Sequence, residues 1–149
     1  MPQIRDGLFM QSQRIAWQTP AALFSDLHHE FDFTLDACAA YDIAQCPEFL
    51  TGLEGLLTSW SGHRVWCNPP YGRGLEKWLS KAALEAAHGV TTCMLLPART
   101  DTRWWHDHAM NADEIRFIKG RLKFGGAKYN APFPSVVLVW RASPGKETI

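Results

Sequence analysis

No excess of either charge is present in this 149-residue chain, in which 15 Lys and Arg balance 15 Asp and Glu. Any contact with nucleic acid must therefore depend on a local basic patch rather than on a general positive field. The chain also lacks an apolar run of membrane-spanning length and the apolar core of a secretion signal after Met1. We therefore expect a cytoplasmic protein that has no membrane partner.

Cysteine is scarce, because the chain has four and no two form a CxxC pair. Cys67 and Cys93 lie in apolar, strand-like runs, so we expect buried thiols rather than a zinc site. The histidines of His106-Asp107-His108 are not expected to chelate a metal either, because residues two apart on a helix point in different directions. The sequence predicts no metal centre.

Internal repeats, low-complexity segments and linkers are also absent. With 46% hydrophobic and 20% charged residues, a chain of this length is typical of one soluble globular domain with a real core. We therefore predict a single domain over residues 1–149, of which residues 1–16 are weakly ordered.

Helices and strands alternate in the predicted secondary structure. Thr19 is expected to cap a helix that begins at Pro20, and Asp101 to cap another that runs to about residue 110. Apolar spacing, with Gly89 as a stop, predicts a further helix at 74–88. Predicted strands cover residues 33–37, 63–67, 90–96, 114–118, 121–124 and 135–140. This order predicts an α/β fold, a mostly parallel sheet with antiparallel C-terminal strands.

The most informative segment is Val65-Trp66-Cys67-Asn68-Pro69-Pro70-Tyr71, an apolar strand that leads into Asn-Pro-Pro-Tyr. A residue before proline is held extended and proline has no N–H, so Asn68 and Pro69 present carbonyl oxygens that no local helix uses. With the Asn68 amide and the Tyr71 ring, these acceptors suit a planar ring that carries an exocyclic amino group. A simple proline turn is the alternative, but the flanking Asn and Tyr favour a functional role.

Six short motifs follow one another with short spacers. They are Trp17-Gln18-Thr19-Pro20, Leu35-Asp36-Ala37-Cys38-Ala39, Glu54-Gly55-Leu56 with Trp60, and residues 65–71, 95–102 and 120–124. In this order, over nearly the whole chain, the sequence resembles the compact phage-type DNA N-6-adenine methyltransferases of the Dam family.

The resemblance implies a compact Rossmann-like methyltransferase fold that uses S-adenosyl-L-methionine and acts on double-stranded DNA. Its catalytic motif would be Asn68, Pro69, Pro70 and Tyr71. The Asn68 side-chain oxygen and the Pro69 carbonyl would accept hydrogen bonds from the amine of a flipped adenine, and Tyr71 would stack on the base. A phage-encoded enzyme of this kind would work in the cytoplasm of a bacterial host.

Cofactor contacts are also implied by the resemblance, at Trp17, Thr19, Pro20, Asp36, Ala37, Cys38 and Glu54. For Thr19 and Pro20 a plain helix-capping role is the alternative, and for Asp36 and Glu54 it is a solvated carboxylate. The usual glycine-rich loop of methyltransferases is missing, since Asp36-Ala37-Cys38-Ala39-Ala40 takes its place. Small residues there still permit the close approach of a ligand to the backbone.

Candidate DNA contacts come from basic residues, namely Arg99, Arg103, Arg121, Lys123 and Lys128. The run from Arg116 to Lys128 has no acid after Glu114, but the usual meaning of such a run is a solvated face. Two further functions stay open. The same acceptor geometry would fit a protein glutamine amide, and the missing glycine loop would fit an inactive binding module of the same fold.

Overall fold

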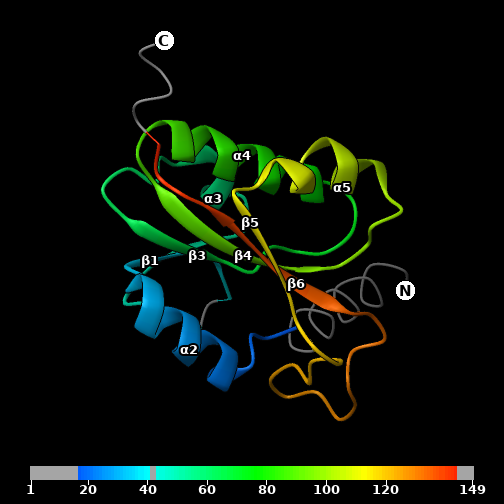
Figure 1. Cartoon of the computed structure of the whole chain (residues 1–149). Coiled ribbons are helices and arrows are strands. Elements are labelled where there is room, and N and C mark those ends of the chain that lie inside the picture. The colour runs from blue at the N-terminus through cyan, green and yellow to red at the C-terminus, as the bar shows by residue number, and fades with distance from the viewer. Residues whose placement is uncertain (1–16, 41–42, 144–149) are drawn as a thin grey trace, which may run out of the picture.

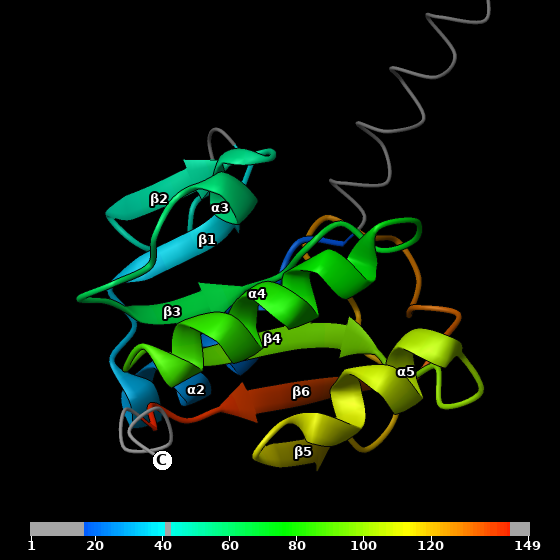
Figure 2. The same ribbon diagram turned by 90° about the horizontal axis from the view of Figure 1, so that it is seen from above.

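The computed structural model describes residues 17–40 and 43–143, so the prediction for residues 1–16 lies outside the described residues. Its centre is a six-stranded sheet in the order β2-β1-β3-β4-β6-β5 (Figures 1 and 2). The strands are β1 (Leu35–Ala39), β2 (Glu48–Thr51), β3 (Arg64–Cys67), β4 (Thr91–Pro97), β5 (Glu114–Phe117) and β6 (Ser135–Trp140).

Strand direction confirms the predicted fold class. β1 pairs in parallel with β2 and β3, and β3 pairs in parallel with β4. β6 lies antiparallel to both of its neighbours, β4 and β5. The sheet is thus mostly parallel, with the antiparallel pairing confined to the C-terminal strands, as the order of helices and strands along the chain predicts.

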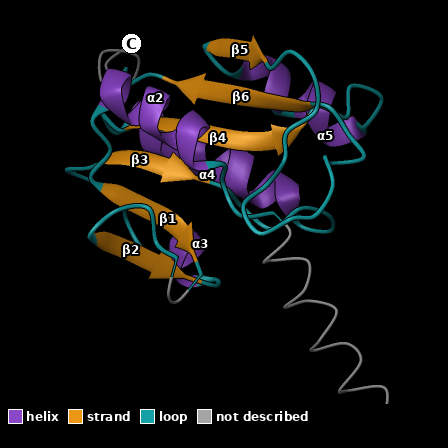
Figure 3. Cartoon of the chain, turned by 90° about the horizontal axis from the view of Figure 1, so that it is seen from below, coloured by secondary structure: helices purple, strands orange, loops and turns teal. Residues whose placement is uncertain are grey.

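Helices cover the sheet on both faces. α2 (Ala21–Phe31) lies on one face, and α3 (Glu54–Leu57), α4 (Leu75–Ala87) and α5 (Arg103–Asp107) lie on the other (Figures 1 and 3). A single 3-10 turn, η1 (Ala109–Asn111), follows α5. α4 buries one stripe of its surface, including Trp78 and Leu79, against the sheet, as its apolar spacing predicts.

Two apolar clusters occupy the two faces of the sheet. On the α4 side, Trp60, Trp78 and Trp105 pack with alternate residues of the central strands. On the α2 side, Phe31, Phe33, Phe124 and Phe133 form an aromatic-rich cluster with Trp66. β4 contributes to both clusters and is almost wholly buried, because helices or loops cover it on both faces of the sheet. Cys67 and Cys93, which lie in β3 and β4, are buried thiols.

Both predicted helix caps are wrong. α2 begins at Ala21 with Pro20 at the cap position, and the Thr19 side chain makes no capping hydrogen bond. α5 is capped by Thr102, whose hydroxyl accepts the backbone N–H of Trp105, and not by Asp101. The Thr19 hydroxyl is used elsewhere, because a tertiary hydrogen bond to Asn68 competes with local capping.

Three further differences concern the strands. Residues 121–124 form no strand, and the alternation of basic and apolar residues there reflects an extended loop in which Phe124 is buried. β2 and α3 have no predicted counterpart, because the edge strand β2 exposes Glu48 and Phe49 and so lacks a clear apolar alternation. β1 covers 35–39 rather than 33–37, so Asp36 lies inside the strand and not at its end.

Candidate active site

Three segments that are distant in sequence meet beyond the carboxyl ends of the parallel strands. They are the segment before α2, the loop after β3 that holds Asn68, and the loop between β5 and β6 (Figure 2). Ligands of open α/β sheets bind outside this edge. In the sheet register Asp36 pairs with Trp66, so Cys38 and Asn68 each lie two residues further along neighbouring strands.

The Asn68 side chain is held by hydrogen bonds on both sides of its amide. Its Nδ2 donates to the backbone oxygen of Trp17 at 2.8 Å and to the Thr19 hydroxyl at 3.2 Å. Its Oδ1 accepts the Tyr71 hydroxyl at 2.8 Å. A backbone carbonyl can only accept, so the amide nitrogen must face Trp17 and the oxygen must face Tyr71. One lone pair of Oδ1 remains for a further donor.

Tyr71 supports Asn68 through its hydroxyl. The same oxygen lies 3.2 Å from the backbone oxygen of Leu95 in β4, so its one hydrogen is shared between two acceptors, of which Asn68 is nearer. Burial, and to a smaller extent Cys67, raises the pKa of Tyr71 well above its ordinary value. The hydroxyl therefore stays protonated and remains a donor to Asn68.

An aromatic cluster surrounds this pair of side chains. The Tyr71 ring lies 6.2 Å from Trp17, 6.4 Å from Phe124 and 5.9 Å from Phe133 between ring centroids. Trp17 packs edge-on against Phe124 at 5.1 Å, and the Arg99 guanidinium lies 5.6 Å from the centroid of the Phe133 ring. Trp17, Tyr71 and Arg99, which the sequence marks as site residues, are thus brought together. Within the tetrapeptide, Pro69 is buried and Pro70 is exposed.

Asp36 shapes the chain after β1. Its carboxylate oxygens accept the backbone N–H groups of Cys38 at 3.2 Å and Gln45 at 2.9 Å, which ties the two sides of the loop together. The side chain is only 2% exposed. Burial raises the pKa of Asp36 to about 6, although the two N–H groups favour the charged form and act in the opposite direction.

Close packing places α3 against the end of β1. A Cβ on Gly55 would overlap the backbone oxygen of Ala37 and approach the Trp78 ring to 2.7 Å, so only glycine fits there. The preceding residue, Glu54, is exposed, and its Oε1 accepts the hydroxyl of Thr51 at 2.7 Å. Glu54 therefore sits beside the carboxyl end of β2, one strand away from Asp36 and Cys38.

The basic residues are less tightly grouped. Arg99, Arg103, Arg121, Lys123 and Lys128 are all exposed, the first at the turn after β4, the second at the start of α5 and the others in the β5–β6 loop. Arg116 belongs to a different surface, because its guanidinium makes a bidentate ion pair with Glu30, with both N–O distances at 2.7 Å. Its charge is therefore compensated, and it is not part of the basic group.

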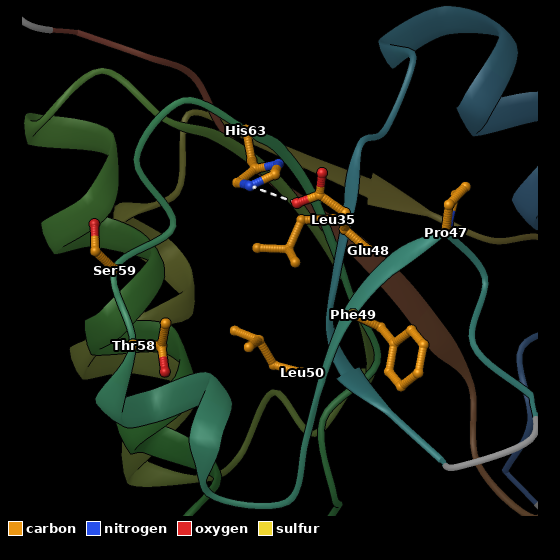
Figure 4. Close-up of a pocket in the computed structure, with 8 residues that line it drawn as sticks. All are labelled: Leu35, Pro47, Glu48, Phe49, Leu50, Thr58, Ser59 and His63. Carbon is orange, nitrogen blue, oxygen red and sulfur yellow. Dashed lines mark ion pairs between the residues drawn. The ribbon is translucent and has the colours of Figure 1, made fainter.

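A pocket among the described residues lies on another part of the molecule. A cavity of about 410 Å³ between β2 and the segment before β3 is lined by Leu35, Pro47, Glu48, Phe49, Leu50, Thr58, Ser59 and His63. At its rim, His63 Nε2 lies 3.2 Å from Glu48 Oε2 (Figure 4). Leu35 and Glu48 begin their strands, so this pocket opens at the amino ends of β1 and β2, away from Asn68. It holds none of the predicted site residues.

Within residues 17–40 and 43–143, no cluster of three or more His, Cys, Asp or Glu is arranged to hold a metal ion. In the same ranges no helix has the length and apolar character that a membrane span requires. His106 Nε2 contacts the backbone oxygen of Thr100, and His108 Nδ1 contacts the hydroxyl of Ser80, so the two rings have different partners.

Several contributors to this site are not among the predicted site residues. Leu95 contributes only a backbone oxygen, Phe124 lies in a motif predicted to be a strand, and Phe133 lies in a loop where an aromatic residue has no regular spacing. Gly125 is joined to Gln18 by an isolated antiparallel bridge. The adjacent pair Gly125-Gly126 is a local signal for a turn, but it does not indicate which segment the turn would contact.

Comparison with known proteins places the chain in a family. Residues 8–146 match the model of the family described as DNA N-6-adenine-methyltransferase (Dam). The chain is 32% identical over 111 residues to the DNA N-6-adenine-methyltransferase of Haemophilus phage HP1 (strain HP1c1), an alignment that covers 72% of this chain and 64% of the relative. It is 33% identical over 112 residues to that of Escherichia phage T1, covering 73% of this chain and 47% of the relative.

The chain thus spans between about half and two thirds of the length of these two relatives. The family match runs through all three segments that meet at the carboxyl edge of the sheet, including the Asn-Pro-Pro-Tyr loop. The chain therefore belongs to the DNA N-6-adenine-methyltransferase (Dam) family.

Proposed function

We propose that this protein transfers a methyl group from S-adenosyl-L-methionine to the N6 amino group of adenine in double-stranded DNA. The observation that carries the proposal is the fixed amide of Asn68, whose oxygen keeps one lone pair for a donor at the carboxyl edge of the sheet. Family membership and the predicted motif order support the same reaction.

Asn68 is the central catalytic residue in this proposal. Its Oδ1, together with the Pro69 carbonyl, accepts hydrogen bonds from the two hydrogens of the exocyclic amine. These bonds fix the orientation of the amine nitrogen, so that its lone pair faces the methyl donor. Because the donor methyl is already activated, positioning supplies most of the catalysis and no metal or nucleophilic side chain is needed.

Tyr71 has two roles in the proposal. Its hydroxyl holds Asn68, and its partly exposed ring offers an aromatic surface to a base flipped out of the duplex. Pro70 is exposed at the start of the following turn, where it keeps the loop extended. A flipped adenine suits this site because its amine is otherwise inside the base stack.

The residues around β1, β2 and α3 fit the cofactor. When bound, S-adenosyl-L-methionine supplies an electrophilic methyl group on a sulfonium. Ala37 is fully buried under α3, whereas Cys38 is partly exposed and can meet a ligand at the end of β1. The exposed Glu54 carboxylate is a suitable acceptor for ribose hydroxyls. Asp36 contributes by fixing this loop through Cys38 and Gln45. Trp17 and Pro20 border the methionine end of the cofactor.

Exposed basic residues are proposed to contact DNA phosphates. Arg121, Lys123 and Lys128 lie on the loop that carries Phe124, whose ring packs against Trp17 and Tyr71 beside Asn68. Arg99 and Arg103 follow β4 on the same edge. Since the chain has no net charge, this local group has to provide the attraction to the duplex.

The test is transfer of a labelled methyl group to unmethylated duplex DNA, with the modified nucleoside identified by mass spectrometry. We expect N6-methyladenine with the unaltered chain. Asn68→Ala should lower turnover by at least about a hundredfold, because it removes a preorganised polar group that binds the reacting amine, while cofactor binding persists. Asn111→Ala is the matched control, since Asn111 lies before β5 and its side chain donates to the backbone oxygen of Asp107, away from Asn68.

Each alternative has its own outcome. Cofactor binding with label on protein glutamine and none on DNA would identify an amide methyltransferase. A folded chain that binds no S-adenosyl-L-methionine in calorimetry would indicate an inactive binding module. Equal turnover of Asn68→Ala and the unaltered chain would remove Asn68 from catalysis.

A further inference from the structure

The segment Trp17-Gln18-Thr19, which leads into α2, accepts two hydrogen bonds from the side chain of Asn68. Thr19 is 8% exposed, and its hydroxyl receives a hydrogen bond from Asn68 Nδ2 at 3.2 Å. Trp17 contributes its backbone oxygen to the same nitrogen at 2.8 Å. The two N–H bonds of the Asn68 amide are therefore both directed at one short segment, which lies 49 to 51 residues earlier in the chain.

Each partner of Asn68 has a different chemical effect. The Trp17 carbonyl can only accept, so it decides which end of the amide is the nitrogen. The Thr19 hydroxyl takes the second N–H, and without it this hydrogen would lack a protein partner in a half-buried site. The two hydrogen bonds together restrict rotation of the amide about its last side-chain bond, which is otherwise broad and roughly two-fold.

The segment itself is fixed from its other side. The backbone N–H of Gly125 donates to the Gln18 oxygen at 2.9 Å in an isolated antiparallel bridge. The fit is close, because a Cβ on Gly125 would lie 3.1 Å from Gln18 Oε1. Trp17 is held in addition by Phe124 and Phe133, with ring centroids 5.1 and 4.9 Å away. The two residues before Thr19 are thus held by the β5–β6 loop, and α2 begins two residues after it.

We propose that Thr19 is a positioning residue, which holds the Asn68 amide in the one orientation that presents Oδ1 to the acceptor amine. The inference rests on the proposed function for its catalytic consequence, and on the geometry alone for the amide orientation. It differs from the cofactor contact expected of Thr19, because it predicts an effect on turnover and not on cofactor affinity.

The experiment compares Thr19→Val, Thr19→Ser and Thr92→Val with the unaltered chain. Valine keeps the shape of threonine without the hydroxyl, and serine restores the hydroxyl. Thr92 is the matched control, because it is fully buried in β4 and its hydroxyl has no partner among the described residues. Thermal unfolding of all four proteins establishes that each is folded.

Two measurements are made on each protein. The first is kcat at saturating cofactor, together with the cofactor Kd from calorimetry. The second is hydrogen exchange of the Asn68 side-chain amide in ¹H–¹⁵N spectra, assigned by its loss in Asn68→Ala. The second measurement needs no substrate, so it tests the orientation of Asn68 even in a protein without activity.

We expect Thr19→Val to lower kcat about tenfold, the equivalent of removing one hydrogen bond, with the cofactor Kd unchanged. Its Asn68 amide should exchange faster, Thr19→Ser should recover most of both effects, and Thr92→Val should match the unaltered chain. A raised cofactor Kd with unchanged kcat would overturn the proposal and make Thr19 a cofactor contact.

Two other results would also overturn it. Equal loss in Thr19→Val and Thr19→Ser would show that the methyl group of Thr19 matters and the hydroxyl does not. Unchanged amide exchange in Thr19→Val would show that Thr19 does not hold Asn68. If the unaltered chain transfers no methyl group to DNA, the proposed function fails, and the exchange measurement alone decides the role of Thr19.

Discussion

Replacement of Asp36 by Asn should change how the stability of this protein depends on pH. The Asp36 carboxyl is buried in β1, and burial raises its pKa from 3.8 to about 6. The folded chain therefore binds this proton more tightly than the unfolded chain does. It follows that Asp36 makes the fold more stable as pH falls through 6 toward 4, and that its charge costs stability above about pH 6.

The magnitude follows from the two pKa values. A shift from 3.8 to about 6 corresponds to about 3 kcal/mol between the fully charged and fully protonated limits. Only part of this free energy is gained between about pH 7 and about pH 5. Over that range the contribution of Asp36 should raise the unfolding free energy by about 1.3 kcal/mol. The neighbouring Cys46 thiol does not interfere, because burial raises its pKa to about 12.

The assay is urea unfolding of the unaltered chain and of Asp36→Asn at a series of pH values in this window. Other carboxyl groups and histidines titrate alike in both proteins, so the difference between the two unfolding free energies isolates Asp36. The unfolding free energy of the unaltered chain minus that of Asp36→Asn should become more positive as pH falls, whatever its value near neutral pH. A difference that stays constant, or moves the other way, would refute a raised pKa at Asp36.

Two further predictions concern packing and DNA binding. Gly55→Ala should lower the unfolding free energy by about 1 to 3 kcal/mol, because the added Cβ would meet the backbone of Ala37 and the Trp78 ring. Urea unfolding measures this change. An unchanged unfolding free energy would show that α3 can move aside. Replacing Arg121 and Lys123 by Ala should reduce the slope of log affinity against log salt by about 1 for each phosphate that is no longer neutralised. Fluorescence anisotropy with duplex DNA measures this slope. Arg64→Ala is the control, since Arg64 is the first residue of β3 and lies at the amino ends of the parallel strands, opposite to Asn68. Equal slopes in all three proteins would place the DNA elsewhere.

Local sequence determined most of the regular structure. The apolar run that forms β4 and the spaced apolar residues of α4 are buried as their patterns predict, because each pattern matches the period of its element. The parallel sheet with C-terminal antiparallel strands also follows from the order of the elements along the chain. The edge strand β2 escaped prediction because it is exposed on both sides and has no such period.

The sequence also marked Asn68 and Tyr71 by itself, because proline restricts the backbone on either side of the motif wherever the loop lies. Only the tertiary structure decided how their side chains are held. The partners of the Asn68 amide come from Trp17 and Thr19, and the second acceptor of Tyr71 is a backbone oxygen of β4. A hydroxyl such as that of Thr19 can cap a helix or bond across the fold, and the choice depends on which groups the folded chain brings within reach.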